Sequence, residues 1–161
     1  MADGDRSAYL DALHLLARRE LSQKQLRDRL IDREHDRAEI DRAIEQLLDA
    51  GSLDDSRVAR AYVQTALKVK GRGRLRIQRE LQEMGIEKEV ATAALAAAFG
   101  EVDERALVRT ALQKKLRGNK KIETPADYAR VYQFLMRQGF SPAVVTATLR
   151  PFRRGGADED A

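Results

Sequence analysis

The side chains in this sequence that are best suited to chemistry are lysines and arginines, which gather in two runs. Residues 68–79 contain six Lys or Arg and no Asp or Glu, and residues 105–121 contain seven, again without an acid. Ammonium and guanidinium groups form charge-assisted hydrogen bonds with phosphates and carboxylates. Because like charges repel, such runs indicate contact with a polyanion or an acidic protein surface; the competing interpretation is a solvated helix face.

Both runs supply candidate contacts to DNA or to an acidic partner. The aromatic residues do not alternate with these cations, so stacking on single-stranded bases is not the expected mode, and contact with backbone phosphates fits better. Phe134 lies off the apolar face of its predicted helix, so it either packs on a neighbouring module or is exposed for a partner. Spacing alone does not say whether the two runs share one surface. The candidate residues are Lys68, Lys70, Arg72, Arg74, Arg76, Arg79, Arg109, Lys114, Lys115, Arg117, Lys120 and Lys121.

Catalytic and metal-binding residues are poorly represented. The two histidines, His14 and His35, lack a metal-ligand spacing such as HExxH, and the absence of Cys removes thiolate ligands and nucleophiles. The GRGR sequence at 71–74 has neither a preceding strand nor the Gly-Lys-Ser/Thr ending of a phosphate-binding loop. Asp54 and Asp55 are explained more simply by a helix cap than by a catalytic carboxylate pair. We therefore expect no catalytic residue, no metal and no cofactor, and a protein that is not an enzyme.

Charge is distributed unevenly along the 161 residues, whose formal net charge is +4. Residues 1–55 have a balance of −5, residues 56–122 of +9 and residues 123–161 of 0.

A hydrophobic content of 43% suffices for a folded core, and the composition favours helices. No apolar run approaches the roughly 18 residues of a membrane span, and no signal peptide is evident. We therefore expect a cytoplasmic protein without membrane contact.

The first basic run continues into a clear amphipathic helix. A helix that begins after Gly73 places an apolar stripe on one side and three cations near the other. Gly85 follows the last apolar residue, where a left-handed turn favours a residue without a Cβ. The stripe is thus expected in the core and the cations on the surface. The stripe consists of Ile77, Leu81 and Met84, and the cations are Arg72, Arg76 and Arg79.

Helix starts elsewhere are marked by capping residues. Ser22 and Gln25 have the spacing of a capping box, and Leu21 with Leu26 has that of a hydrophobic staple. Further start signals are Ser7, Asp54, Thr124 before Pro125, and Ser141 before Pro142. From helical periodicity we expect burial of Tyr9, Ala12, Leu13, Leu16 and Ala17 in the first helix, and of Val58, Ala61, Tyr62 and Thr65 in the fourth.

The pattern of the basic helix recurs 54 residues later. Seven positions between 76 and 95 match seven between 130 and 149, including a glycine turn at Gly85 and Gly139. With no strand alternation, the sequence predicts an all-α protein of nine helices in three tandem three-helix modules. Small modules bury little surface alone, so we expect an elongated array that can curve. The predicted bounds are 7–51, 53–100 and 102–150, followed by a disordered tail at 151–161.

Three stretches resemble the signature sequences of a known family. They are ALHLLARRELSQKQLRDRL at 12–30, LDDSRVARAYV at 53–63 and KGRGRLRIQRELQEMGI at 70–86. These stretches are similar to sequences of the RecX family, regulators of the bacterial RecA recombinase. The resemblance extends over all three modules. The sequence departs from the family at Val58, where an aromatic residue is frequent, and at Leu21, where a polar or aromatic residue is frequent.

The resemblance implies an inhibitor of RecA that binds in the groove of the RecA–DNA filament. It implies restraint of ATP hydrolysis, strand exchange and the recombination, DNA repair and SOS response that depend on RecA. Contacts with DNA phosphates accompany those with protein, and we expect a monomer. The alternative from the residues alone is a free-standing helical protein that binds DNA without sequence specificity, or a transcriptional regulator with helix-turn-helix pairs.

Overall fold

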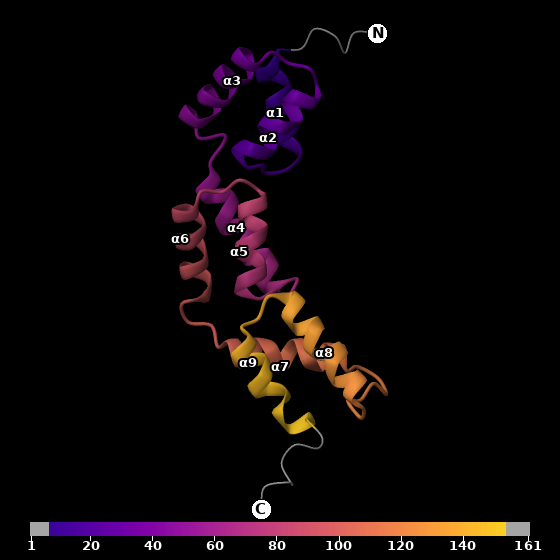
Figure 1. The fold of residues 1–161 in the computed structure, drawn as a ribbon. Coiled ribbons are helices and arrows are strands. Elements are labelled where there is room, and N and C mark those ends of the chain that lie inside the picture. The colour runs from indigo at the N-terminus through magenta and orange to yellow at the C-terminus, as the bar shows by residue number, and fades with distance from the viewer. Residues whose placement is uncertain (1–6, 154–161) are drawn as a thin grey trace, which may run out of the picture. The chain divides into compact units, whose positions relative to one another are not determined.

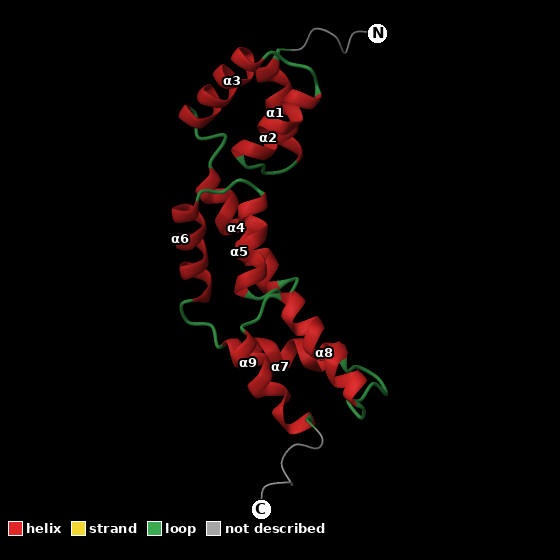
Figure 2. Cartoon of the chain, in the orientation of Figure 1, coloured by secondary structure: helices red, strands yellow, loops and turns green. Residues whose placement is uncertain are grey.

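The computed structural model describes residues 7–153, and all regular structure in this range is helical (Figure 1). Figure 2 shows the same range without a strand. For the described residues this confirms the all-α prediction and the count of nine α-helices, which a 3-10 turn, η1 (Arg150–Phe152), follows. The helices are α1 (Ala8–Arg18), α2 (Gln23–Asp32), α3 (Arg37–Asp49), α4 (Asp55–Lys68), α5 (Arg74–Glu83), α6 (Lys88–Phe99), α7 (Glu104–Lys115), α8 (Pro125–Gln138) and α9 (Pro142–Leu149).

The chain forms two compact units. Unit 1 comprises residues 1–62 and 80–94, and unit 2 comprises residues 63–79 and 95–161. Helices α4, α5 and α6 therefore each contribute one part to unit 1 and the other part to unit 2. All twelve candidate cations belong to unit 2, so any surface that they share lies on that unit.

The core of unit 1 lies between α1, α2 and α3, which pack against one another. The capping box predicted at the start of α2 is present: the Gln25 N–H donates to Ser22 Oγ at 3.2 Å, and the Ser22 N–H donates to Gln25 Oε1 at 3.0 Å. Leu21 and Leu26, the predicted staple, are both fully buried. Local sequence therefore fixes where α2 begins.

The buried face of α1 differs from the prediction. Tyr9 and Leu13 are 37% and 36% exposed, and of the predicted stripe only Ala12 is buried. The core takes the neighbouring face, which also carries Asp11, whose carboxylate lies 2.6 Å from the imidazole of His35. Because α1 has apolar residues on both faces, periodicity did not distinguish them. The buried apolar residues of α1 are Ala8, Ala12 and Leu15.

The stripe predicted for α4 is also partly wrong. Val58 is buried as predicted, but Ala61 and Thr65 are exposed and Tyr62 is half-buried. Small and apolar residues occupy several sides of this helix, so the helical period did not single out its core face. Its other buried residues are Ala59, Val63, Ala66 and Leu67.

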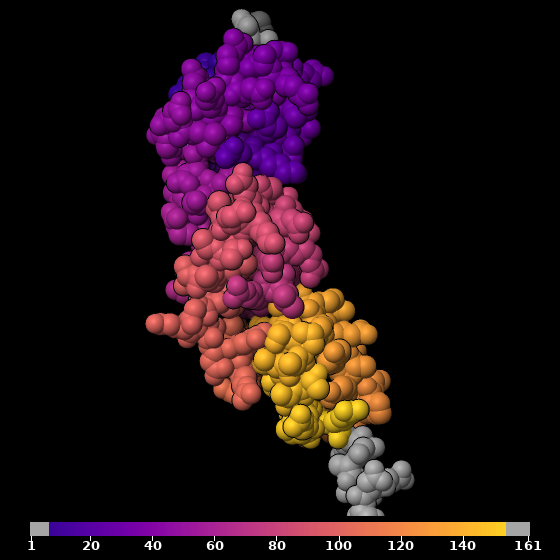
Figure 3. Space-filling view, turned by 60° about the vertical axis from the view of Figure 1, so that its left-hand side comes forward, coloured from indigo at the N-terminus to yellow at the C-terminus, as the bar shows by residue number. Residues whose placement is uncertain are grey.

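Helices α7, α8 and α9 enclose the core of unit 2, and Figure 3 shows the surfaces of α8 (orange) and α9 (yellow) side by side. The predicted cap at Thr124 is present as a capping box with Asp127, and Pro125 occupies the first turn. Ser141 is the N-cap residue of α9 and Pro142 begins the helix, as predicted, but the Ser141 side chain forms no capping hydrogen bond. Instead its N–H and hydroxyl donate to the Glu104 carboxylate at 2.7 and 3.1 Å, which ties the start of α9 to α7.

The 54-residue repeat has the same structural meaning in α5 and α8. Leu81 and Leu135 are both 0% exposed. The glycines that follow these helices adopt positive φ angles, 76° at Gly85 and 95° at Gly139. The repeat thus encodes the same element twice: a helix with a buried leucine that ends in a left-handed glycine turn.

No helix within residues 7–153 is both long and apolar enough to cross a bilayer. At the C-terminal side, Pro151 and Phe152 of the predicted tail belong to η1. Arg153 follows without regular structure, and residues 154–161 of the predicted tail lie outside the described residues.

Candidate nucleic-acid interface

The first basic run is anchored by a junction between the start of α5 and the end of α8. The Gly73 N–H donates to the Gln138 carbonyl at 2.7 Å, and the Leu75 N–H donates to the Gly139 carbonyl at 3.0 Å. The first amides of a helix and the last carbonyls of a helix both lack partners within their own helix. Here two amides at the start of α5 bond to two carbonyls at the end of α8, which replaces a capping side chain for those two amides.

The junction depends on two glycines. A Cβ on Gly73 would lie 2.5 Å from the carbonyl carbon of Gly139, and a Cβ on Gly139 would lie 2.3 Å from the backbone nitrogen of Arg76. Backbone atoms cannot move aside as the end of a flexible side chain can. Both positions therefore require a residue without a Cβ.

A cavity of about 380 Å³ in unit 2 brings cations of the two runs together. Lys68 and Lys70 line it from the end of α4 and the turn that follows, and Lys114 lines it from α7. We call it the lysine cavity. All three lysines are exposed at the surface. The two runs, separate in sequence, thus share one surface at this place.

Phe134 also lines the lysine cavity, and its ring packs against the core of unit 2. The ammonium of Lys115 lies over this ring, 4.7 Å from its centroid, which is the geometry of a cation–π interaction. Phe134 is therefore half-buried against the core of unit 2 and is not a fully exposed side chain. Its contact also orients a cation of the second run.

Three arginines of the first run lie close to one another in unit 2. Arg72 and Arg76 are half-buried and Arg79 is exposed. Partial burial lowers the pKa of Arg76, and the positive charges of Arg72 and Arg79 lower it further. An arginine remains charged at physiological pH despite such a shift. Burial is the larger cause of this shift, and the smaller, repulsive part shows that the three positive charges lie near one another beside the junction.

The structure does not bring all twelve candidates into the lysine cavity. Arg74 is exposed on α5, while Arg117, Lys120 and Lys121 are exposed beyond the end of α7. Arg109 lies on another face of α7, where it lines a different cavity.

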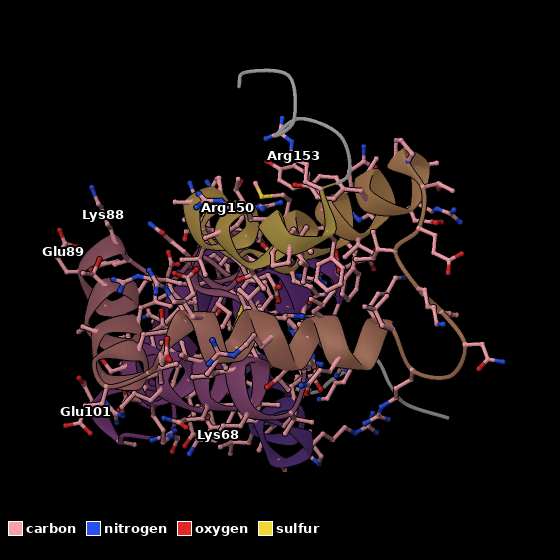
Figure 4. The ribbon with its side chains drawn as sticks, turned by 90° about the horizontal axis from the view of Figure 1, so that it is seen from below. Lys68, Lys88, Glu89, Glu101, Arg150 and Arg153 are labelled. Carbon is pink, nitrogen blue, oxygen red and sulfur yellow. The ribbon has the colours of Figure 1, made fainter. Side chains whose placement is uncertain are left out.

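This second cavity, of about 810 Å³, brings the candidate Arg109 together with two arginines outside the candidate set, Arg105 and Arg150. Arg105 and Arg109 line it from successive turns of α7, and Arg150 lines it from η1. We call it the arginine cavity. In Figure 4, Lys68 and Arg150 lie on opposite sides of α7. The i, i+4 spacing of Arg105 and Arg109 was a readable signal, but only the fold brings Arg150 to them.

Asp54 and Asp55, considered above as a catalytic pair, have structural partners in unit 1. So do the two histidines, which were considered as metal ligands. Asp54 accepts from the N–H groups of Ser56 and Arg57 at 3.0 and 3.2 Å, as a helix cap does. Asp55 accepts from the Gln23 N–H at 2.9 Å, and burial raises the pKa of its carboxyl group. Among residues 7–153 no cluster of three or more His, Asp or Glu is placed to hold a metal ion.

These features define a class of protein: an all-α protein of repeated three-helix units with a cationic surface. Family models match three successive segments, described as the first, second and third three-helix domains of RecX, at residues 8–47, 54–95 and 103–149. Regulatory protein RecX of Halorhodospira halophila is 34% identical over 152 residues, which cover 92% of this chain and 87% of the relative. The chain belongs to the RecX family of regulatory proteins.

Further relatives differ in length. Regulatory protein RecX of Acidithiobacillus ferrooxidans is 32% identical over 138 residues, covering 86% of this chain and 85% of the relative. The chain spans 55% of the length of its relative in Geobacillus kaustophilus, with 30% identity. Membership of a family of regulatory proteins confirms the prediction that the chain is not an enzyme.

Solved structures agree on the fold. The crystal structure of RecX from Lactobacillus salivarius matches with a TM-score of 0.70 at 22% identity, covering 90% of this chain and 94% of that one. A second crystal structure of regulatory protein RecX matches with a TM-score of 0.76 at 20% identity, covering 89% and 71%. With the three family matches, this confirms three tandem three-helix domains.

Proposed function

We propose that this protein regulates the RecA recombinase, as an inhibitor that binds in the groove of the RecA–DNA filament. It restrains ATP hydrolysis and strand exchange by RecA, and with them recombination and the SOS response. Family membership supports regulation, since the relatives bear the name regulatory protein RecX. Their bacterial origin fits action in the cytoplasm, where the chromosome lies.

The observation that carries the proposal is the joint lining of one cavity by cations from both basic runs. Lys68 and Lys70 come from the first run and Lys114 from the second. Each ammonium that meets a DNA phosphate releases a condensed counterion, so such a surface gains affinity without reading sequence. Sequence-independent contact suits a regulator that acts wherever a filament has formed.

The two units differ in net charge, which fits a target that consists of both protein and DNA. Residues 1–55, with a balance of −5, lie in unit 1, whereas the twelve candidate cations lie in unit 2. An acidic surface is repelled by DNA, so unit 1 is assigned to RecA protein and unit 2 to the DNA within the filament. Two attachments on one monomer raise the effective concentration of the second after the first has formed. Filaments, which offer both targets, are therefore preferred over free RecA or free DNA.

The experiment that tests this function measures ATP hydrolysis and strand exchange by RecA on single-stranded DNA. The full chain, added at fewer copies than RecA, is expected to slow both reactions. Neither reaction slowing even at equimolar amounts would contradict the proposal. A protein that instead holds a preferred duplex site at high salt without RecA would be the transcriptional regulator of the alternative interpretation.

A further inference from the structure

The arginine cavity has a strong positive charge that the described residues do not balance. Arg105 and Arg150 are exposed and form no ion pair within residues 7–153. Arg109 has one acidic neighbour, Asp103, whose carboxylate oxygen lies 4.0 Å from its guanidinium, beyond hydrogen-bond distance. Three guanidinium groups thus face one hollow without a close carboxylate.

The floor and rim of this cavity suit a short peptide segment. Leu112 and Leu116 of α7 supply apolar surface, and Phe152, 38% exposed, stands at its edge. Guanidinium groups hold carboxylates in a two-point geometry that lysine cannot reproduce. The chemistry therefore favours a ligand that combines carboxylates with small apolar groups.

A segment of that composition follows the cavity in the sequence. Residues 157–161 read ADEDA, with three consecutive acids, Asp158, Glu159 and Asp160. Phe152, which lines the cavity, precedes Asp158 by six positions. Six residues reach up to about 20 Å when extended, whereas Arg105 and Arg109 are only about 6 Å apart along α7. The acidic segment is long enough to reach all three arginines.

We propose that the arginine cavity is a carboxylate-binding site and that its occupant is the acidic segment 157–161 of the same chain. Exposed ion pairs are individually weak, so a free peptide of this sequence would bind poorly. The short tether compensates, because it holds the carboxylates near the arginines at a high effective concentration. The contact is reversible and weakens as salt rises.

One consequence of this contact rests on the proposed function. While the acidic segment occupies the arginine cavity, that side of α7 is neutralised, whereas the lysine cavity stays available to DNA phosphates. A polyanion at sufficient local concentration displaces the segment and adds three arginine contacts. The segment thus lowers the affinity for free DNA more than the affinity for a RecA–DNA filament, which unit 1 already holds through RecA.

The direct test does not involve DNA. The full chain is compared with a variant carrying Asp158→Asn, Glu159→Gln and Asp160→Asn, using NMR of the arginine Nε–Hε groups at low salt. Resonances of Arg105, Arg109 and Arg150 are expected to shift, while those of Arg117 and Arg137, exposed elsewhere on unit 2, stay in place. Adding about 0.5 M NaCl to the unmodified chain should produce the same shifts. Unmoved cavity resonances, or equal shifts at Arg117 and Arg137, would overturn the proposal.

A double-variant cycle tests the consequence for DNA separately. Neutralising the three acids is expected to tighten binding of single-stranded DNA about fivefold when the cavity is intact. The gain should fall below about twofold when Arg105→Gln, Arg109→Gln and Arg150→Gln are also present, because nothing is then uncovered. An equal gain in DNA affinity with and without the three arginines would show that net charge alone causes the effect. That result would overturn the claim that the acidic segment masks DNA contacts. If the NMR shifts appear but no variant binds DNA, the docking stands and the proposed DNA contact fails.

Discussion

The N–H of Gly73 donates to the carbonyl of Gln138 at 2.7 Å, so the first turn of α5 is completed by the last turn of α8. Unit 1 contains a related contact at the start of α2, where the Ser22 hydroxyl donates to the Met84 carbonyl at 2.5 Å. Met84 and Gln138 are 54 residues apart and each precedes a left-handed glycine. In both units, one helix start is therefore hydrogen-bonded to the glycine turn that ends another helix.

Substituting Gly139 is expected to destabilise the protein much more than substituting an open glycine. Gly139→Ala adds a Cβ 2.3 Å from the Arg76 nitrogen at a φ of +95°, whereas Gly118→Ala, at +80°, meets nothing within 4 Å. We expect the unfolding free energy to fall by about 3 kcal/mol or more for Gly139→Ala and by about 1 kcal/mol for Gly118→Ala. Urea denaturation measures both, and equal losses would show that the junction is not tightly packed.

Ser22→Ala tests the equivalent contact in unit 1. It removes a cap from α2 and leaves the half-buried Met84 carbonyl without its donor, so we expect a loss of about 2–3 kcal/mol. Thr124→Ala, which removes an exposed capping box from α8, provides the matched control and should cost about 1 kcal/mol. If the two substitutions cost the same by thermal and urea denaturation, the Ser22–Met84 bond contributes nothing beyond capping.

Asp127 gives a prediction for pH. Hydrogen bonding with the Thr124 side chain, followed by the N–H groups of Glu123 and Thr124, lowers its pKa from the ordinary value of 3.8. A carboxyl group with a lowered pKa in the folded state stabilises the fold above its unfolded pKa, and this contribution is lost as pH falls through the folded pKa. Asp127→Asn should therefore be less stable than the unmodified chain at pH 6, with the gap closing toward pH 2. A gap that stays constant over this range would contradict the assignment.

The capping and turn signals predicted local structure well because each is complete within a few residues. Ser22 with Gln25 and Thr124 with Asp127 form the expected boxes, and Gly85 takes the expected positive φ. Burial was harder to predict where a helix is apolar on two sides. Tyr9 belonged to a good stripe on α1, yet the core uses the adjacent face, since packing partners rather than period decide between such faces.

The candidate site was only partly predictable for a related reason. Composition identified the two basic runs, but the meeting of Lys68 with Lys114 results from packing between elements far apart in the sequence. Arg150 stands outside both runs and joins Arg105 only in the folded chain. Ser141 was predicted to cap α9 locally, but its hydroxyl donates to the carboxylate of Glu104, which is distant in the sequence.

The lysine cavity should account for a measurable part of the salt dependence of DNA binding. Replacing Lys68, Lys70 and Lys114 together by Gln should weaken binding of single-stranded DNA and reduce the slope of log K against log salt by about 2. A control with the same charge change in unit 1, Arg18→Gln, Arg29→Gln and Arg42→Gln, should leave that slope nearly unchanged. Equal effects in the two triple variants would show that net charge alone governs binding.

The central claim is tested most directly by binding of the full chain to immobilised RecA filaments on single-stranded DNA with a non-hydrolysable nucleotide. Free RecA and bare DNA are measured in parallel, as is the variant lacking the three lysines of the lysine cavity. We expect binding to the filament at least about tenfold tighter than to either component, and a clear loss in the lysine variant. Binding to filament no tighter than to bare DNA, or unaffected by loss of the three lysines, would contradict the account.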